Sequence, residues 1–242
     1  MATNIRAIRE RLLSGISRLR DQEQFTDLVL AHDDGDFNVH RVIVCPQSKV
    51  LHKACTGGFE ETFSGVIHME HMSHIELERM VAFFYEADYV EDLPDGAEVS
   101  PLQLHVRMFA LADQYDIPDL GMIAAKKYSS RCTKPWIPME FLESVRDVYD
   151  TTLMSNRTLR DMVCMTIRKH LPQMLDDEGI AELYEETLAE SPEFAKDLLK
   201  SYVDCPFYGG CIACGSNQPM EALQARCKNC GKGTSGLRSC LD

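Results

Sequence analysis

The sequence predicts a protein of short β-strands and many helices that ends in a small cysteine-rich module. Three observations indicate this class. Strand-like apolar runs are confined to residues 26–69, whereas apolar residues recur at helical spacing over much of residues 73–200. Six of the ten cysteines lie within residues 205–242. A chain of 242 residues has room for one large or two small domains.

The composition and the charge exclude several classes of protein. With 45% hydrophobic and 26% charged residues, the chain is typical of globular proteins rather than of disordered or fibrous ones. The net charge of −13 argues against a general positive field for nucleic acid. The charge is unevenly spread: residues 1–20 carry +4, residues 205–242 carry +2, and residues 21–204 carry −19. We expect the acidic run at 176–178 to be a solvated helix face and loop.

Residues 1–20 are predicted to form an amphipathic helix with arginines away from its apolar stripe. Such a helix suits a membrane surface or an organelle transit peptide, but packing on the next domain or on a partner subunit is the simpler interpretation. No stretch of signal-peptide or membrane-spanning length is present, so we expect a soluble protein of the cytoplasm, the nucleus or both. The stripe comprises Ile5, Ile8, Leu12, Leu13, Ile16 and Leu19.

Strand signals follow between residues 26 and 69. The apolar run 26–32, the acidic turn 33–36 and the alternating run 37–40 predict a β-hairpin, with Asp34-Gly35 suited to a tight turn. Residues 42–45 and 66–69 are short apolar runs of the kind found in buried strands. Between them a helical stretch runs to Cys55, and Gly57-Gly58 is a signal for its end.

Helix signals dominate the rest of the chain. Ser73 and Glu76 fit a capping box that opens a helix running to Tyr85. A second helix is predicted at about 101–115, and the acidic segment 86–100 between the two is predicted to be a loop. Residues 139–200 are helical in pattern throughout, and we expect Pro172 and Pro192 to mark helix boundaries.

Several motifs, taken in order, resemble those of a BTB/POZ domain, and in particular the BTB proteins common in filamentous fungi. The resemblance covers about residues 22–201. It implies an α+β fold, a small mixed sheet capped by helices, at 21–128, followed by an all-helical extension at 129–204. The motifs are Phe25-Thr-Asp-Leu-Val-Leu, Phe37-Asn-Val-His-Arg-Val-Ile-Val-Cys, Phe59-Glu-Glu, Phe84-Tyr-Glu-Ala-Asp-Tyr and Leu111-Ala-Asp-Gln-Tyr.

The resemblance also implies a protein that binds other proteins and is not an enzyme. Many relatives dimerise, and several classes recruit a cullin scaffold for ubiquitin transfer. Asp27 and Arg41 match the charged pair at the floor of the groove in dimeric members, and Phe59 with Glu61 matches the element used for cullin binding. The alternatives are structural: Asp27 and Arg41 would neutralise each other, and Phe59 would be a packed aromatic beside a solvated acid.

The cysteine-rich module at 205–242 carries two C-x-x-C motifs, Cys211/Cys214 and Cys227/Cys230, separated by 12 residues. Zinc takes four thiolates in a tetrahedron, so a small structural zinc-ribbon-like site is predicted. A redox pair or disulfides are the alternatives. Cys205 and Cys240 are surplus, and either could replace one of the four ligands. A site closed by four thiolates has no open position for catalysis.

Two functions follow from these features. The first is a protein-interaction module that forms homo- or hetero-oligomers and serves as a substrate adaptor of a cullin-type ubiquitin ligase. The alternative is a zinc-dependent transcription or chromatin regulator whose tail contacts nucleic acid, which the −13 net charge disfavours. No acid/base or nucleophile constellation predicts an enzyme. The basic residues of the tail are Arg226, Lys228, Lys232 and Arg238.

Overall fold

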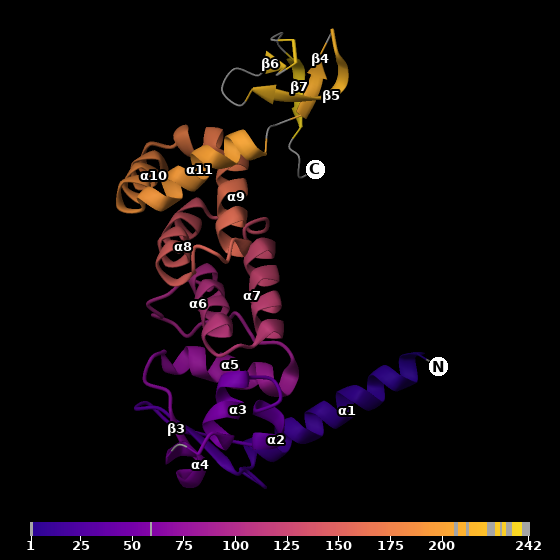
Figure 1. The fold of residues 1–242 in the computed structure, drawn as a ribbon, viewed down its shortest axis with the longest axis vertical. Helices are drawn as coiled ribbons and strands as arrows, with labels where there is room; N and C mark the ends of the chain where they lie inside the picture. Colours follow the sequence, from indigo (N-terminus) through magenta and orange to yellow (C-terminus); the bar gives the residue numbers. More distant parts are fainter. Residues whose placement is uncertain are drawn as a thin grey trace. The chain divides into compact units, whose positions relative to one another are not determined.

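A computed structural model describes residues 2–58, 60–205, 208–211, 213–221, 226–227, 229–230 and 234–238. The chain divides into two compact units, Met1–Glu140 and Phe141–Asp242. Figure 1 traces the elements of each unit along the chain. No described helix is both long and apolar enough to span a membrane.

The first unit contains a three-stranded sheet with the order β2-β1-β3. Strands β1 (Leu28–Ala31) and β2 (Phe37–Val39) form the predicted antiparallel hairpin, and β3 (Val66–His68) pairs with β1 in parallel. Leu30 lies opposite Phe37 on one side and Ile67 on the other. Gly35 in the hairpin turn has φ of +144°, and a Cβ there would lie 3.3 Å from Nε2 of His74. The turn therefore favours glycine for both conformation and space.

Short helices follow the hairpin: α2 (Arg41–Val44), α3 (Lys49–Thr56) and α4 (Glu60–Ser64). The interpretation of residues 42–45 as a buried strand is wrong, because they lie mostly in α2. The Asp27 carboxylate accepts the first N–H of this helix, and Val42 is 75% exposed, so the run lacks the two buried faces of an inner strand. The predicted end of α3 is confirmed, since Gly58 has φ of +75°.

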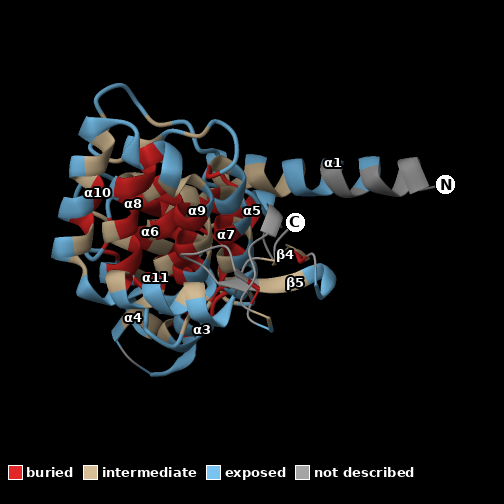
Figure 2. Cartoon of the chain, turned by 90° about the horizontal axis from the view of Figure 1, so that it is seen from above, coloured by how far each residue is buried: buried red, intermediate tan, exposed pale blue. Residues whose placement is uncertain are grey.

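Longer helices complete the first unit: α5 (His74–Glu86), α6 (Pro101–Gln114) and α7 (Pro118–Arg131). The capping box of Ser73 and Glu76 is confirmed, and Ser100 with Gln103 forms a second one at α6. The sequence pattern does not predict helix α7, because two of the residues on its buried face, Ala124 and Ala125, are only weakly apolar. Figure 2 colours the buried residues of these helices red.

The N-terminal helix α1 (Ala2–Asp21) confirms the amphipathic prediction. Its last turns are half-buried against α5, where the Arg20 guanidinium lies 4.9 Å above the Tyr85 ring. Residues 11–14 are exposed. Figure 1 shows α1 extending beyond α5, on which its last turns pack.

The second unit contains helices α8 (Pro138–Thr151, which begins at the end of the first unit), α9 (Thr158–Leu175), α10 (Glu178–Glu190) and α11 (Pro192–Asp204). The helical prediction for 139–200 is thus confirmed. Pro192 opens α11 as predicted, but Pro172 lies inside α9. A proline in the last turn removes only one backbone hydrogen bond, and the buried Met174 beyond it keeps that turn packed.

The tail forms a small antiparallel sheet with the order β6-β5-β4-β7. Its strands are β4 (Tyr208–Cys211), β5 (Gly215–Glu221), β6 (Arg226–Cys227) and β7 (Thr234–Arg238). The first C-x-x-C motif spans the turn between β4 and β5, and the second begins at the end of β6.

Candidate functional site

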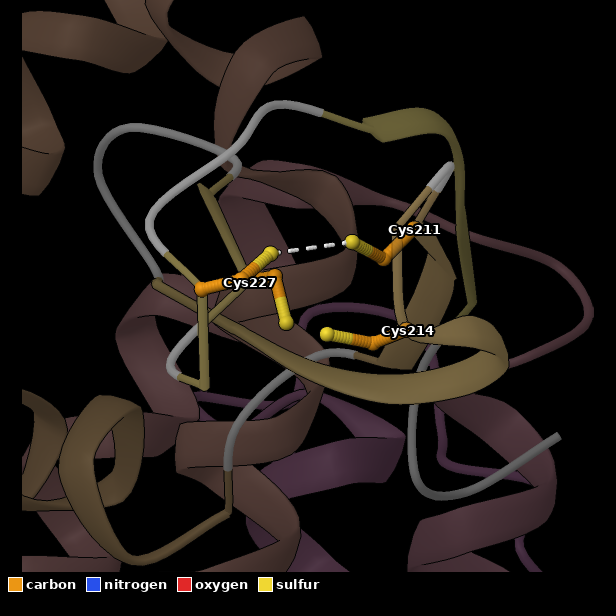
Figure 3. Close-up of side chains that lie close together, drawn as sticks. Cys211, Cys214 and Cys227 are labelled. Atoms are coloured by element: carbon orange, nitrogen blue, oxygen red, sulfur yellow. Dashed lines mark hydrogen bonds between the residues drawn. The ribbon is translucent and has the colours of Figure 1, made fainter.

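Four cysteines converge in the tail. The Sγ atoms of Cys211, Cys214, Cys227 and Cys230 all lie within 4.8 Å of one another. The Cys211 and Cys230 sulfurs are 3.1 Å apart. Figure 3 shows the thiols of Cys211, Cys214 and Cys227 pointing toward a common centre. The structure therefore brings together the four cysteines whose spacing predicted a metal site, and this cluster could hold a metal ion.

The donor set fits zinc. A tetrahedral Zn²⁺ with Zn–S bonds of about 2.3 Å has sulfur–sulfur edges of about 3.8 Å, between the 3.1 Å contact and the 4.8 Å limit of this cluster. A hydrogen bond with Cys230 lowers the pKa of Cys211 to about 6. Hydrogen bonds with the other thiols of the cluster, that of Cys230 first, raise the pKa of Cys214 to about 12, so the cluster favours one thiolate at Cys211 rather than several.

The described part of the tail has little apolar material of its own. Its buried core consists of Cys211 and Cys227, with Cys230 packed against them. A module with so small an apolar core of its own has little to fold around unless a ligand joins its cysteines.

The surplus cysteines differ from the four. Cys205 is exposed at the end of α11, where its carbonyl accepts a 2.5 Å hydrogen bond from Nη2 of Arg168, and it is not part of the cluster. Cys240 lies outside the described residues, as do the side chains of the four basic tail residues.

Asp27 and Arg41 contact each other through backbone atoms. The Asp27 carboxylate accepts the backbone N–H of Arg41 at 2.7 Å, and Nε of Arg41 donates to the Asp27 carbonyl at 3.0 Å. Asp27 is exposed and Arg41 is half-buried. The link ties the start of β1 to the start of α2, and it leaves the Asp27 carboxylate accessible to a partner.

The predicted cullin-type element lies at α4. Glu61 is half-buried on this helix, whereas Phe59 lies outside the described residues. Phe63, on the same helix, is 83% exposed. Phe63 is not among the residues that the sequence predicts to bind a partner, because a phenylalanine within a short helix is ordinarily expected in the core.

A second exposed apolar surface lies on α1. Ile8, Leu12 and Leu13 are 52%, 64% and 44% exposed. Phe25, just after the helix, is 82% exposed and has φ of +62°. A bulky residue rarely adopts a positive φ, and contiguous exposed apolar side chains are typical of interaction surfaces.

Comparison with known proteins identifies the class of the first unit. The family model described as the BTB/POZ domain matches residues 16–130. These residues, with their small mixed sheet and covering helices, are therefore a BTB/POZ domain, which confirms the resemblance seen in the sequence. The fungal subtype stays a prediction.

Curated relatives share part of this region. Kelch-like protein 26 of Danio rerio is 35% identical over 82 residues, which are 34% of this chain and 14% of that protein. Kelch-like protein 26 of Mus musculus is 28% identical over 102 residues, 42% of this chain and 17% of that protein. The matches thus span less than a fifth of these relatives. The solved BTB domain of zebrafish PATZ1 is 15% identical with a TM-score of 0.39, and the alignment covers 48% of this chain and 86% of that one.

Proposed function

We propose that this chain is a protein-interaction module that self-associates through its BTB/POZ domain. The BTB/POZ match at residues 16–130 carries the proposal. It is supported by the exposed apolar surface of α1, where Leu12 is 64% exposed. A second copy of the chain would remove these side chains from water, which stabilises association by about 1.5–3 kcal/mol for each fully buried leucine.

Sedimentation equilibrium of the full chain tests self-association. We expect a dimer or larger oligomer, and Leu12→Glu should weaken its association at least about 10-fold, because the substitution places a charge in the apolar contact. Ser14→Glu is the matched control, since Ser14 is exposed on the same helix and polar. A wild-type chain that remains monomeric at high concentration would contradict the proposal.

The module is further proposed to act as an adaptor for a cullin-type scaffold through α4. Phe59 and Glu61 match the element that adaptor-type BTB domains use, and Phe63 on α4 offers a partner an apolar side chain that is 83% exposed. The variant Phe59→Ala with Glu61→Lys should weaken scaffold binding at least about 10-fold. Glu60→Lys, an exposed change on the same helix, is the control. If the double variant binds the scaffold as tightly as the wild type, the proposed adaptor role is wrong. The proposal of self-association does not depend on this result.

The tail is proposed to bind one structural Zn²⁺ through Cys211, Cys214, Cys227 and Cys230. Elemental analysis of the purified chain should give one zinc per chain, and Cys214→Ser should lower this ratio. Cys205→Ser is the matched control, because Cys205 is a tail cysteine outside the cluster. A metal-free wild-type chain would overturn the assignment.

A further inference from the structure

One histidine of the BTB/POZ domain is completely enclosed. His105 on α6 is 0% exposed, and both its ring nitrogens have partners. Nδ1 lies 2.8 Å from the Tyr89 hydroxyl, and Nε2 lies 3.1 Å from Oε2 of Glu91. Both partners come from the segment 87–100 between α5 and α6, named here the acidic loop because it has five carboxylates and no lysine or arginine.

The partners determine the protonation state of the ring. A carboxylate can only accept a hydrogen bond, so Nε2 must carry the proton that goes to Glu91. Nδ1 is then an acceptor, and the Tyr89 hydroxyl donates to it. Every polar atom of the neutral ring is therefore satisfied. A second proton on Nδ1 would make the Tyr89 oxygen the acceptor, and the hydroxyl hydrogen of Tyr89 would lose the acceptor that it has in this arrangement.

The surrounding charges act on the imidazolium ion in both directions. Glu91 favours it through its hydrogen bond and its charge, whereas Lys127 and Arg131 on α7 act against it with smaller effects. Lys127 also lies 2.9 Å from the Asp88 carboxylate and 5.1 Å above the Tyr89 ring, so α7 gives the loop a second attachment. Burial, the largest effect, lowers the pKa of His105 to about 4. The Glu91 side chain remains 46% exposed, which gives water access to the edge of the site.

We propose that Tyr89, Glu91 and His105 form a proton-controlled latch, which holds the acidic loop on α6 and releases it when the imidazole is protonated. In the released loop the imidazole reaches water and regains its ordinary affinity for protons. Acidification therefore favours release, since the released state binds the proton more tightly than the latched state.

The size of the effect follows from the two proton affinities. With a pKa of 6.5 in the released state and about 4 in the latched state, the released population rises about 20-fold between pH 7 and pH 5. The released population rises as the pH falls between these two pKa values, and it levels off below about pH 4.

Digestion of the full chain with a glutamate-specific protease measures release. The protease must take the Glu91 side chain into its own pocket, so cleavage after Glu91 requires an open latch. Cleavage of a short, unstructured glutamate peptide added to the same digest is the reference, since the ratio of the two rates cancels the protease's own pH dependence. We expect the ratio of Glu91 cleavage to peptide cleavage to rise about 20-fold from pH 7 to pH 5.

Two variants and one control make the test specific. His105→Gln keeps an N–H donor but cannot titrate, so its ratio should stay constant with pH. Tyr89→Phe leaves Nδ1 buried without a donor and should raise the ratio about 10-fold at pH 7. Tyr115→Phe, which removes a buried hydroxyl that contacts Met69, should behave like the wild type.

Three results would overturn the latch. The first is a wild-type ratio that does not change with pH. The second is a His105→Gln ratio that rises as in the wild type. The third is parallel cleavage after Glu76, which is 7% exposed on α5, because that cleavage reports opening of the whole domain rather than of the loop.

Discussion

At the scale of single residues, buried polar side chains join segments that are distant in the sequence. Ser48, 1% exposed, accepts the Leu51 N–H as the N-cap of α3 and donates a 2.6 Å hydrogen bond to the Tyr115 carbonyl after α6. One hydroxyl therefore satisfies a helix end and a carbonyl 67 residues away. Replacing it would leave both backbone groups buried without this partner.

Ser48→Ala should lower the free energy of unfolding of the BTB/POZ domain by about 1–3 kcal/mol, through the lost cap and the orphaned carbonyl. Urea unfolding of the full chain, followed by circular dichroism, measures the change. Ser14→Ala removes an exposed hydroxyl and should stay within about 0.5 kcal/mol of the wild type. Equal effects of the two substitutions would contradict this role of Ser48.

At the scale of elements, α9 organises the second unit through two buried arginines. Arg160, 3% exposed, donates to the Tyr149 and Thr152 carbonyls at the end of α8, and its guanidinium lies 4.6 Å from the Tyr149 ring centroid. Arg168, two turns later, donates to the Ser201 and Cys205 carbonyls at the end of α11. Each cation meets the negative end of a neighbouring helix, where positive charge is stabilising.

Arg160→Met should destabilise the helices of the second unit by about 2–4 kcal/mol, because it orphans buried carbonyls and leaves Glu193 without its 3.1 Å partner. The matched control is Arg146→Met, whose 40% exposed side chain pairs with the 54% exposed Glu190, and which should cost less than about 1 kcal/mol. Thermal unfolding of the full chain distinguishes the two. Destabilisation by Arg146→Met as large as by Arg160→Met would show that burial is not the deciding factor.

At the scale of the whole molecule, the two units and the tail differ in what holds them together. The first unit buries residues such as Leu30 and Met80, and the helices of the second unit bury Phe141, Ile167 and Phe194. The described tail instead buries cysteines. The helices therefore owe their stability to apolar burial, whereas the tail would take its stability from the metal that we propose.

A zinc chelator should consequently unfold the tail and leave the helices intact. We expect the far-ultraviolet circular dichroism of the helices to persist while trypsin begins to cleave within residues 205–242. Cys214→Ser should show this susceptibility without chelator. A chelator-induced loss of the helical signal would mean that the metal supports the second unit as a whole.

The sequence by itself determined features whose causes act within a few residues. The hairpin follows from alternation and from Asp34-Gly35, and α5 begins where Ser73 and Glu76 cap it. The two C-x-x-C motifs also place their thiols in pairs, because two intervening residues bring both sulfurs to one turn. These patterns are local, so one chain is enough to find them.

Only the tertiary structure decided features that depend on contacts between distant segments. The sequence pattern of residues 42–45 is that of a strand. In the structure the Asp27 carboxylate, 14 residues upstream of Arg41, accepts the first N–H of α2, and the segment is helical. The exposure of Phe63 and the enclosure of His105 by Tyr89 and Glu91 depend on how the helices pack. Periodicity shows which side of an element is apolar, but packing decides which side chains are enclosed and which polar groups meet there.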